Sequence, residues 1–151
     1  MTRLSRRPGR KGGPPIEAVL DTNVLVSALL TPGGLCRKIT DHVFAGRVQA
    51  FVDERMLREY EAVARRPELP INPAQAETLL TVMSSAAAFV VATPLAVALP
   101  HPHDLPFLEV AHEMDATLVT GNLRHFPRKA RRGVIVLSPR EFLELLEDSS
   151  H

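Results

Sequence analysis

Short apolar segments that alternate with longer amphipathic segments constrain the fold of this 151-residue chain more than any other feature. The apolar segments end at turn-forming residues and predict buried strands, whereas apolar residues at helical spacing predict helices. The predicted strands span residues 16–20, 48–52, 88–92, 117–119 and 134–137. The predicted helices span residues 24–30, 35–45, 54–66, 73–87, 104–114 and 139–147. Strands separated by helices form parallel sheets that are covered on both faces, so we expect an α/β fold.

Basic residues are concentrated at the N-terminus. Residues 1–15 contain five arginines and lysines, no acidic residue and several glycines and prolines. Such a segment has too few apolar groups to offset the entropy of ordering, so we expect a disordered basic tail. It is either a contact for nucleic-acid phosphates or a solubilising leader. One domain is expected over residues 16–147, followed by a C-terminal tail at 148–151.

The chain lacks the sequence features of secreted and membrane proteins. Its single cysteine, Cys36, cannot form an intrachain disulfide and excludes a cysteine-based zinc cluster. The longest apolar run, at residues 86–92, is far shorter than the ~18 residues of a membrane span, and the basic N-terminus lacks the apolar segment of a secretory signal. These features predict a cytoplasmic protein without a membrane partner. The lack of tryptophan and the single tyrosine predict that base stacking on aromatic side chains does not dominate any nucleic-acid contact.

Polar residues directly follow two of the predicted strands. The first strand is followed by Asp21, Thr22 and Asn23, and the fourth by Thr120, Gly121 and Asn122. Ligands of parallel sheets bind at the carboxyl ends of the strands, so these residues are candidates for a binding or catalytic site. Each residue of the first group is also a good helix N-cap, and the residues alone leave both interpretations open.

A further candidate carboxylate begins the helix at 104–114. Asp104 lies near the apolar face of this helix, where it needs a partner, either the helix N–H groups or a divalent cation. Glu109, His112 and Glu113 are expected on the opposite, solvent-facing side.

The helix at 54–66 offers two glutamates. Glu59 and Glu61 lie on opposite borders of its apolar stripe, and periodicity does not distinguish them. Either glutamate is also compatible with a solvated helix face.

Five segments of the chain, taken in order, resemble motifs of PIN-domain nucleases. They are residues 18–28, 57–67, 104–111, 118–127 and 137–143. The resemblance spans about residues 16–147. It is to the subgroup of PIN proteins that are toxins of toxin–antitoxin pairs, of the VapC type. The resemblance implies an α/β/α sandwich around a central parallel sheet of about five strands, with a metal-dependent endoribonuclease site. It also implies a homodimer and an antitoxin protein as a partner.

The resemblance assigns roles to individual residues. Asp21, Glu59 and Asp104 match the three acidic positions that bind the metal and carry catalysis. Asn23 matches the polar residue that supports the first aspartate, whereas Thr120 and Asn122 stand in the fourth motif. The implied cofactor is Mg²⁺ or Mn²⁺, which neutralises charge on the phosphate oxygens and lowers the pKa of a bound water. Without a cation, three carboxylates in one cleft raise one another's pKa.

Two departures from the family pattern bear on the metal site. Asn122 is neutral where many relatives carry an acid, which favours one metal ion over two. His101 and His103 precede Asp104 where similar sequences often carry acids. This histidine pair is either a site for a softer metal, such as Zn²⁺ or Mn²⁺, or simply solvated.

Five basic residues follow the fourth motif and are candidates for RNA binding. They are Arg124, Arg128, Lys129, Arg131 and Arg132. Such a cluster can bind an RNA backbone or an acidic antitoxin segment, and it is equally typical of a solvated loop.

Two other functions stay open at the level of the sequence. Asn122 and the basic tail favour a catalytically weak or degenerate PIN module that binds RNA or a protein partner. A phosphohydrolase with Asp21 as its nucleophile fits less well, because such enzymes usually carry a second aspartate two residues later and this chain has Asn23.

Overall fold

Five parallel strands form the centre of the molecule in the computed structural model, which describes residues 13–149. They are β1 (Ile16–Leu20), β2 (Val48–Val52), β3 (Ala88–Phe89), β4 (Thr117–Val119) and β5 (Val136–Leu137). Their order across the sheet is β3-β2-β1-β4-β5, and each neighbouring pair is parallel. The predicted five-stranded parallel sheet is confirmed.

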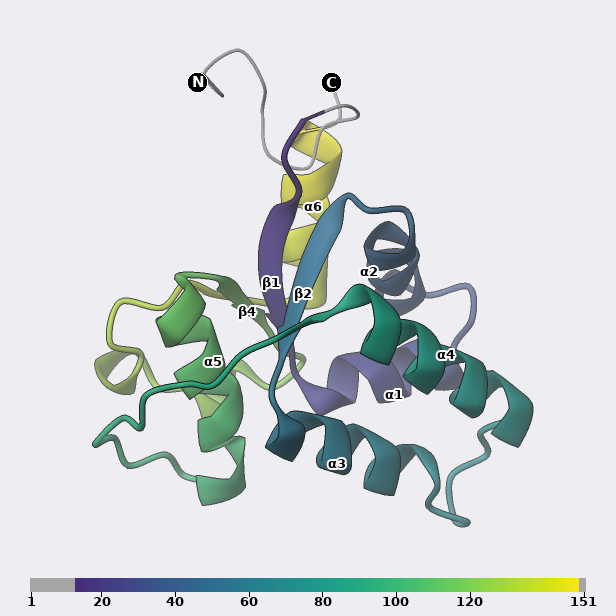
Figure 1. The fold of residues 1–151 in the computed structure, drawn as a ribbon, viewed down its shortest axis with the longest axis horizontal. Coiled ribbons are helices and arrows are strands. Elements are labelled where there is room, and N and C mark those ends of the chain that lie inside the picture. Colours follow the sequence, from purple (N-terminus) through teal and green to yellow (C-terminus); the bar gives the residue numbers. More distant parts are fainter. Residues whose placement is uncertain (1–12, 150–151) are drawn as a thin grey trace.

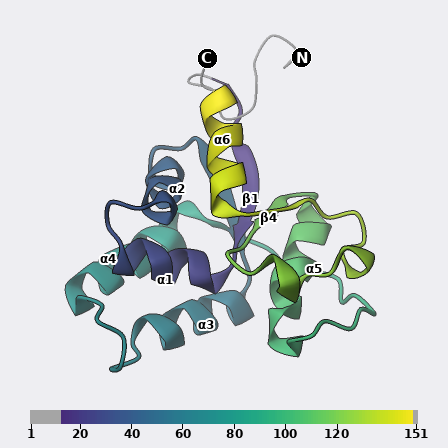
Figure 2. The same ribbon diagram turned by 180° about the vertical axis from the view of Figure 1, so that it is seen from behind.

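Helices connect the strands and cover the sheet. The α-helices of the described chain are α1 (Thr22–Leu30), α2 (Leu35–Phe44), α3 (Glu54–Ala64), α4 (Pro73–Ala86), α5 (Leu105–Met114) and α6 (Pro139–Ser149), and the short 3₁₀ turns are η1 (Pro102–Asp104), η2 (Leu123–His125) and η3 (Arg128–Ala130). Opposite views in Figures 1 and 2 show α5 on one face of the strands and α6 on the other. The predicted α/β/α layering is therefore present. None of the helices between residues 13 and 149 is long and apolar enough to cross a membrane.

Capping side chains set the start of several helices. Asp53 follows β2, and its carboxylate accepts the N–H of Met56 at 2.9 Å, which caps α3 as predicted. At α6, the N–H of Ser138 donates to Glu141 at 2.9 Å and the N–H of Glu141 donates to the Ser138 hydroxyl at 3.2 Å, which is the predicted capping box. Helix α1 begins two residues before its predicted start because Asp21 caps it.

The strands β3 and β5 are shorter than the apolar runs that predict them. β3 pairs with β2 only at Ala88 and Phe89, and Val91 is 96% exposed. β5 begins at Val136, two residues after its predicted start. Arg132 and Gly133, directly before that predicted start, adopt left-handed backbone angles with φ of 51° and 86°. An apolar run therefore becomes a strand only as far as a neighbouring strand can pair with it.

Predictions for the two ends of the chain fall partly outside the described residues. The predicted basic tail lies there except for residues 13–15, and so do residues 150–151 of the predicted C-terminal tail. Helix α6 extends to Ser149, past its predicted end.

The register of the sheet brings the ends of β1 and β4 together. Leu20 of β1 lies beside Val119 of β4, and the N–H of Asp21 donates to the Val119 carbonyl at 2.9 Å. Asp21 and Thr120 therefore sit next to each other at the carboxyl edge of the sheet. The hydroxyl of the fully buried Tyr60 donates to the Leu20 carbonyl, which holds α3 against the same edge.

Candidate active site

Asp21 lies at the end of β1 and is 3% exposed. Its Oδ1 accepts the N–H of Thr22 at 2.8 Å. Its Oδ2 accepts the Thr120 hydroxyl at 2.7 Å and the side-chain amide of Asn23 at 3.2 Å. Asp21 thus does both things that the sequence leaves as alternatives. It caps α1, and it belongs to a polar cluster.

Glu59 and Glu61 of α3 have different surroundings. The hydroxyl of Thr22 donates to Oε2 of the half-buried Glu59. The N–H of the same threonine donates to Asp21, so Thr22 links the two carboxylates. Glu61 is exposed and pairs at 3.5 Å with Arg65, the C-cap of the same helix. The structure therefore brings Glu59, and not Glu61, to the carboxyl edge of the sheet.

Asp104 ends η1 directly before α5 and is 5% exposed. Within the described chain its carboxylate makes no capping bond to α5. Its Oδ2 instead lies 2.9 Å from Nδ1 of His125, in η2. The helix N–H groups are therefore not the partner of this buried carboxylate. The sequence does not single out His125, because only the turn of η2 brings it back to Asp104.

Electrostatic interactions link the three carboxylates. Burial raises the pKa of Asp21 above its ordinary value of 3.8, and the negative charges of Asp104 and Glu59 also raise it. Hydrogen bonds from Thr120 and from the N–H of Thr22 act in the opposite direction without cancelling the increase. An anionic group that is disfavoured in this way is stabilised by a nearby cation.

The donors at this edge suit a hard divalent cation. Carboxylate oxygens are the ligands that Mg²⁺ prefers, and Mg²⁺ usually keeps several waters and binds through one or two carboxylates. Between residues 13 and 149, no group of three or more His, Cys, Asp or Glu side chains is arranged so that it could hold a metal ion. Glu59 and Asp104 contact Thr22 and His125. The three carboxylates therefore fit a cation that one or two of them bind directly and the rest through bound water.

The segment after β4 supports Asp21. The Thr120 hydroxyl that donates to Asp21 also accepts the N–H of Asn122 at 3.0 Å. The N–H of Gly121 donates to Asn23 Oδ1 at 2.9 Å. A Cβ atom at position 121 would lie 3.2 Å from that oxygen, so glycine allows the two segments to approach this closely. Asn23 and Thr120 thus lie where the sequence predicts, around Asp21, while Asn122 is exposed.

A family model for the PIN domain matches residues 17–124. This chain belongs to the PIN domain family. The resemblance carried by the five sequence segments is therefore confirmed. An uncharacterized protein of Methanocaldococcus jannaschii is 29% identical to this PIN domain protein over 143 residues, which cover 87% of this chain and 92% of the relative.

Two solved structures share the fold of this PIN domain. VapBC2 from Rickettsia felis, crystallised bound to a DNA fragment from their promoter, superimposes with a TM-score of 0.56 at 16% identity and covers 82% of this chain and 98% of that chain. PAE2754 from Pyrobaculum aerophilum superimposes with a TM-score of 0.51 at 19% identity and covers 91% of this chain and 94% of that chain. At these identities the likeness concerns the fold.

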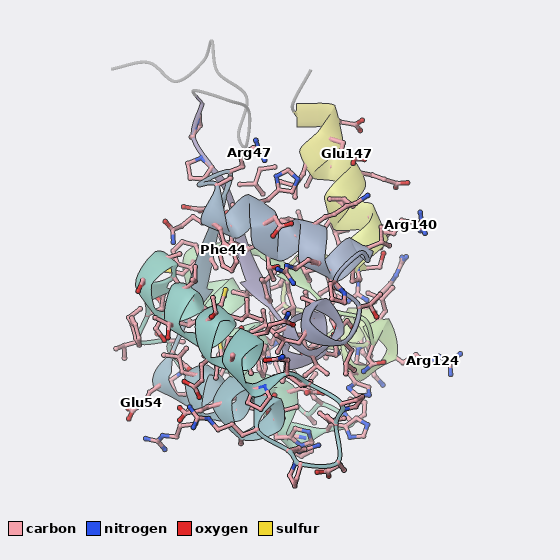
Figure 3. The ribbon with its side chains drawn as sticks, turned by 90° about the vertical axis from the view of Figure 1, so that its right-hand side faces the viewer. Phe44, Arg47, Glu54, Arg124, Arg140 and Glu147 are labelled. Carbon is pink, nitrogen blue, oxygen red and sulfur yellow. The ribbon has the colours of Figure 1, made fainter. Side chains whose placement is uncertain are left out.

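A cavity of about 640 Å³ lies beside Asp104 in this PIN domain, because His125, which contacts the Asp104 carboxylate, lines it. Its lining comes from two loops: Pro100 and His101 before η1, and Gly121, Asn122, Leu123, Arg124 and His125 after β4. Figure 3 shows Arg124 projecting from the surface.

The basic residues after the fourth motif do not share one environment. Arg128 and Lys129 are exposed in η3. Arg131 and Arg132 donate to the backbone carbonyls of Phe126 and Ala96, each at 2.8 Å, and so fix loops. The predicted RNA-binding residues Arg124, Arg128 and Lys129 are exposed, and so is Arg132, whereas Arg131 is half-buried.

Glu109 is buried, contrary to the prediction from helical periodicity. The pattern predicts that it lies on the solvent-facing side of α5, but it is 3% exposed. Arg55 of α3 donates to its Oε1 at 2.8 Å and also pairs with Asp53 at 2.6 Å. The N–H of Leu95 donates to the other oxygen of Glu109 at 2.8 Å. A buried carboxylate is tolerated here because an arginine and a backbone N–H satisfy it, and the helical pattern of α5 alone does not reveal either partner.

Proposed function

We propose that this PIN domain is a metal-dependent endoribonuclease that hydrolyses RNA phosphodiester bonds, with Asp21, Glu59 and Asp104 as its catalytic, metal-binding residues. The observation that carries the proposal is that Asp21 and Asp104 are buried, at 3% and 5% exposure, and that Thr22, whose N–H donates to Asp21, also donates to Glu59. Burial, and then the charges of Asp104 and Glu59, raise the pKa of Asp21. These carboxylates come from three separate parts of the chain, and they meet where ligands of parallel sheets bind. Membership of the PIN family supports a nuclease.

The proposed cofactor is Mg²⁺ or Mn²⁺. When bound, such a cation neutralises charge on the phosphate oxygens and lowers the pKa of a bound water. Asn122, in the fourth motif, offers an amide oxygen without charge, which favours one metal ion.

Neighbouring residues hold the carboxylates in place. Thr120 and Asn23 donate to Asp21, so they fix its orientation. The Thr22 hydroxyl holds Glu59, and His125 holds Asp104. These are positioning residues, because each acts through a carboxylate.

Exposed basic residues supply the proposed contacts with the RNA backbone. Arg124 lines the cavity beside Asp104, and Arg128 and Lys129 lie exposed in η3. Each cation that neutralises a phosphate strengthens binding and makes it depend on salt.

The proposed biological role is that of the toxin in a toxin–antitoxin pair, acting in the cytoplasm as a homodimer. The sequence resemblance to VapC-type toxins supports it, and the fold is shared with VapBC2 from Rickettsia felis. A neighbouring reading frame that encodes a small antitoxin would support this role.

A catalytically weak PIN module that binds RNA or a protein partner is the second candidate. The observation that favours it is the neutral Asn122 in the fourth motif. Calorimetric titration separates the two functions, because an absence of Mg²⁺ and Mn²⁺ binding at millimolar concentration favours the binding module.

Cleavage of labelled single-stranded RNA tests the proposed function. We expect the wild-type protein to cut the RNA with Mg²⁺ or Mn²⁺ and not with a chelator. The Asp104→Asn variant loses a proposed metal ligand, so its rate should fall by at least about a hundredfold. Thermal unfolding checks that the variant is folded. Equal cleavage by the folded variant at equal purity would contradict the assignment of Asp104.

A further inference from the structure

We propose that the cavity beside Asp104 is a nucleotide subsite for single-stranded RNA, in which a base stacks on the imidazole of His101 and a phosphate pairs with Arg124. The proposal deepens the ribonuclease function, since it rests on that function for the position of the cut bond. The cavity itself is defined independently of any catalysis, by the loops at 100–101 and 121–125.

The size and lining of the cavity suit a nucleotide. Its volume of about 640 Å³ falls within the ~300–1,000 Å³ of small-molecule sites. None of the described residues that line it is acidic, and Arg124 supplies a cation. Asn122 adds an exposed side-chain amide, which carries both donors and an acceptor for the edge of a base.

Two imidazole rings form a stacking platform at this cavity. The ring centroids of His101 and His125 are 4.1 Å apart, and the rings are tilted by 35°. His101 is exposed, whereas the side chain of His125 is 30% exposed and is held by Asp104. Histidine is among the side chains on which unpaired RNA bases stack. RNA bases can therefore stack on this surface although the chain has no tryptophan and a single tyrosine.

The same geometry argues against a metal site at these histidines. The rings of His101 and His125 lie over one another, and those of His101 and His103 meet edge to face at 5.9 Å. A softer metal at His101 and His103, one of the two interpretations of this pair, gains no support.

The platform is connected to the proposed catalytic carboxylates. Nδ1 of His125 lies 2.9 Å from Oδ2 of Asp104. A base stacked on His101 would therefore belong to a nucleotide next to the phosphate that the carboxylate centre cuts. The subsite would hold the RNA strand at one side of the cut bond.

Binding of fluorescein-labelled single-stranded RNA, measured by anisotropy in a chelator, tests the subsite without catalysis. We expect His101→Ala to weaken binding about fivefold, whereas His101→Phe, which keeps a ring, binds like the wild-type protein. Arg124→Ala should weaken binding and reduce the slope of log affinity against log salt by about 0.7. Both side chains are exposed, so these variants should fold, which thermal unfolding verifies.

Two control variants test whether the loss of any surface histidine or arginine would weaken RNA binding. His112→Ala and Arg140→Ala change exposed residues that do not line the cavity, so they should bind RNA like the wild-type protein. Figure 3 shows that Arg140, like Arg124, points outward.

Three results would overturn the subsite: wild-type protein that does not bind RNA, His101→Ala or Arg124→Ala binding as tightly as the controls, and His101→Phe binding as weakly as His101→Ala. A separate cleavage assay with Mn²⁺ keeps the two proposals distinguishable. If the wild-type protein binds RNA through His101 and Arg124 but does not cut it, the subsite is supported and the ribonuclease function is contradicted. If the wild-type protein cuts RNA but His101→Ala and Arg124→Ala bind RNA as tightly as the wild type, the ribonuclease function is supported and the subsite is contradicted.

Discussion

Asp21 serves both the fold and the proposed chemistry. It caps α1 through the N–H of Thr22, and it lies buried among the charges of Glu59 and Asp104. Because burial and, to a lesser extent, these charges raise the pKa of Asp21, the folded protein holds this proton more tightly than the unfolded chain does. Ionisation of Asp21 therefore lowers the free energy of unfolding as the pH rises from about its ordinary 3.8 through the raised pKa.

A divalent cation should reverse this loss of stability. We expect Mn²⁺ or Mg²⁺ to raise Tm at neutral pH, by the equivalent of about 2.7 kcal/mol at a hundred times the Kd. The increase should disappear as the pH falls through the raised pKa of Asp21, because the protonated carboxyl does not bind the cation. Thermal melts with and without Mn²⁺ across this range measure the effect. An increase in Tm that is the same at acidic and neutral pH would contradict the role of Asp21.

The residues of this site differ in how far the sequence predicts them. Asp21, Asn23 and Thr120 follow strands, and parallel strands end at one edge, so their meeting could be expected. The choice of Glu59 over Glu61 comes from the family resemblance and not from periodicity, since both border the same stripe. His125 could not be predicted, because its contact with Asp104 depends on the path of the chain between β4 and β5.

At the scale of elements, an ion-pair cluster ties α3 to α5. Arg55 bridges Asp53 at the start of α3 and the buried Glu109 of α5. Glu109 also accepts the N–H of Leu95, so the cluster anchors the Pro-rich segment that leads to Asp104. The sequence predicts the six α-helices of residues 13–149. Helical periodicity nevertheless places Glu109 in solvent, because the partners of Glu109 lie on other elements.

Removal of Arg55 should destabilise the protein more than removal of a surface arginine. Arg55→Ala leaves Glu109 buried without its cation, and we expect a loss of about 2 kcal/mol, below the ~3–5 of a fully buried pair because the Arg55 side chain is 47% exposed. Arg58→Ala, which breaks an exposed pair with Glu54, should cost at most about 0.5 kcal/mol. Urea unfolding measures both variants. Equal losses would show that the cluster contributes no more than a surface ion pair.

At the scale of the whole molecule, the chain order of strands and helices gave the fold class. Its outer strands are shorter than the apolar runs because pairing ends early at β3 and β5. The position of the site follows from the topology, since Asp21 and Thr120 come from adjacent parallel strands at the centre of the sheet.

The proposed assembly is a homodimer, by resemblance to other PIN proteins. Sedimentation at micromolar concentration should therefore give twice the 16.6 kDa mass of one chain. A single species with the mass of one chain under these conditions would contradict the dimer, while leaving the proposed chemistry intact.

We propose that the carboxylates at one edge of the sheet cut RNA with a bound cation. A comparison of two glutamates on the same helix, Glu59 and Glu61, tests this most directly. The measurement is the rate at which wild-type, Glu59→Gln and Glu61→Gln proteins cleave labelled single-stranded RNA in Mn²⁺. Glu59 is held beside Asp21 by Thr22, whereas Glu61 is exposed beside Arg65. We predict that Glu59→Gln loses cleavage and Glu61→Gln keeps the wild-type rate. Equal rates for the two folded variants would contradict the claim.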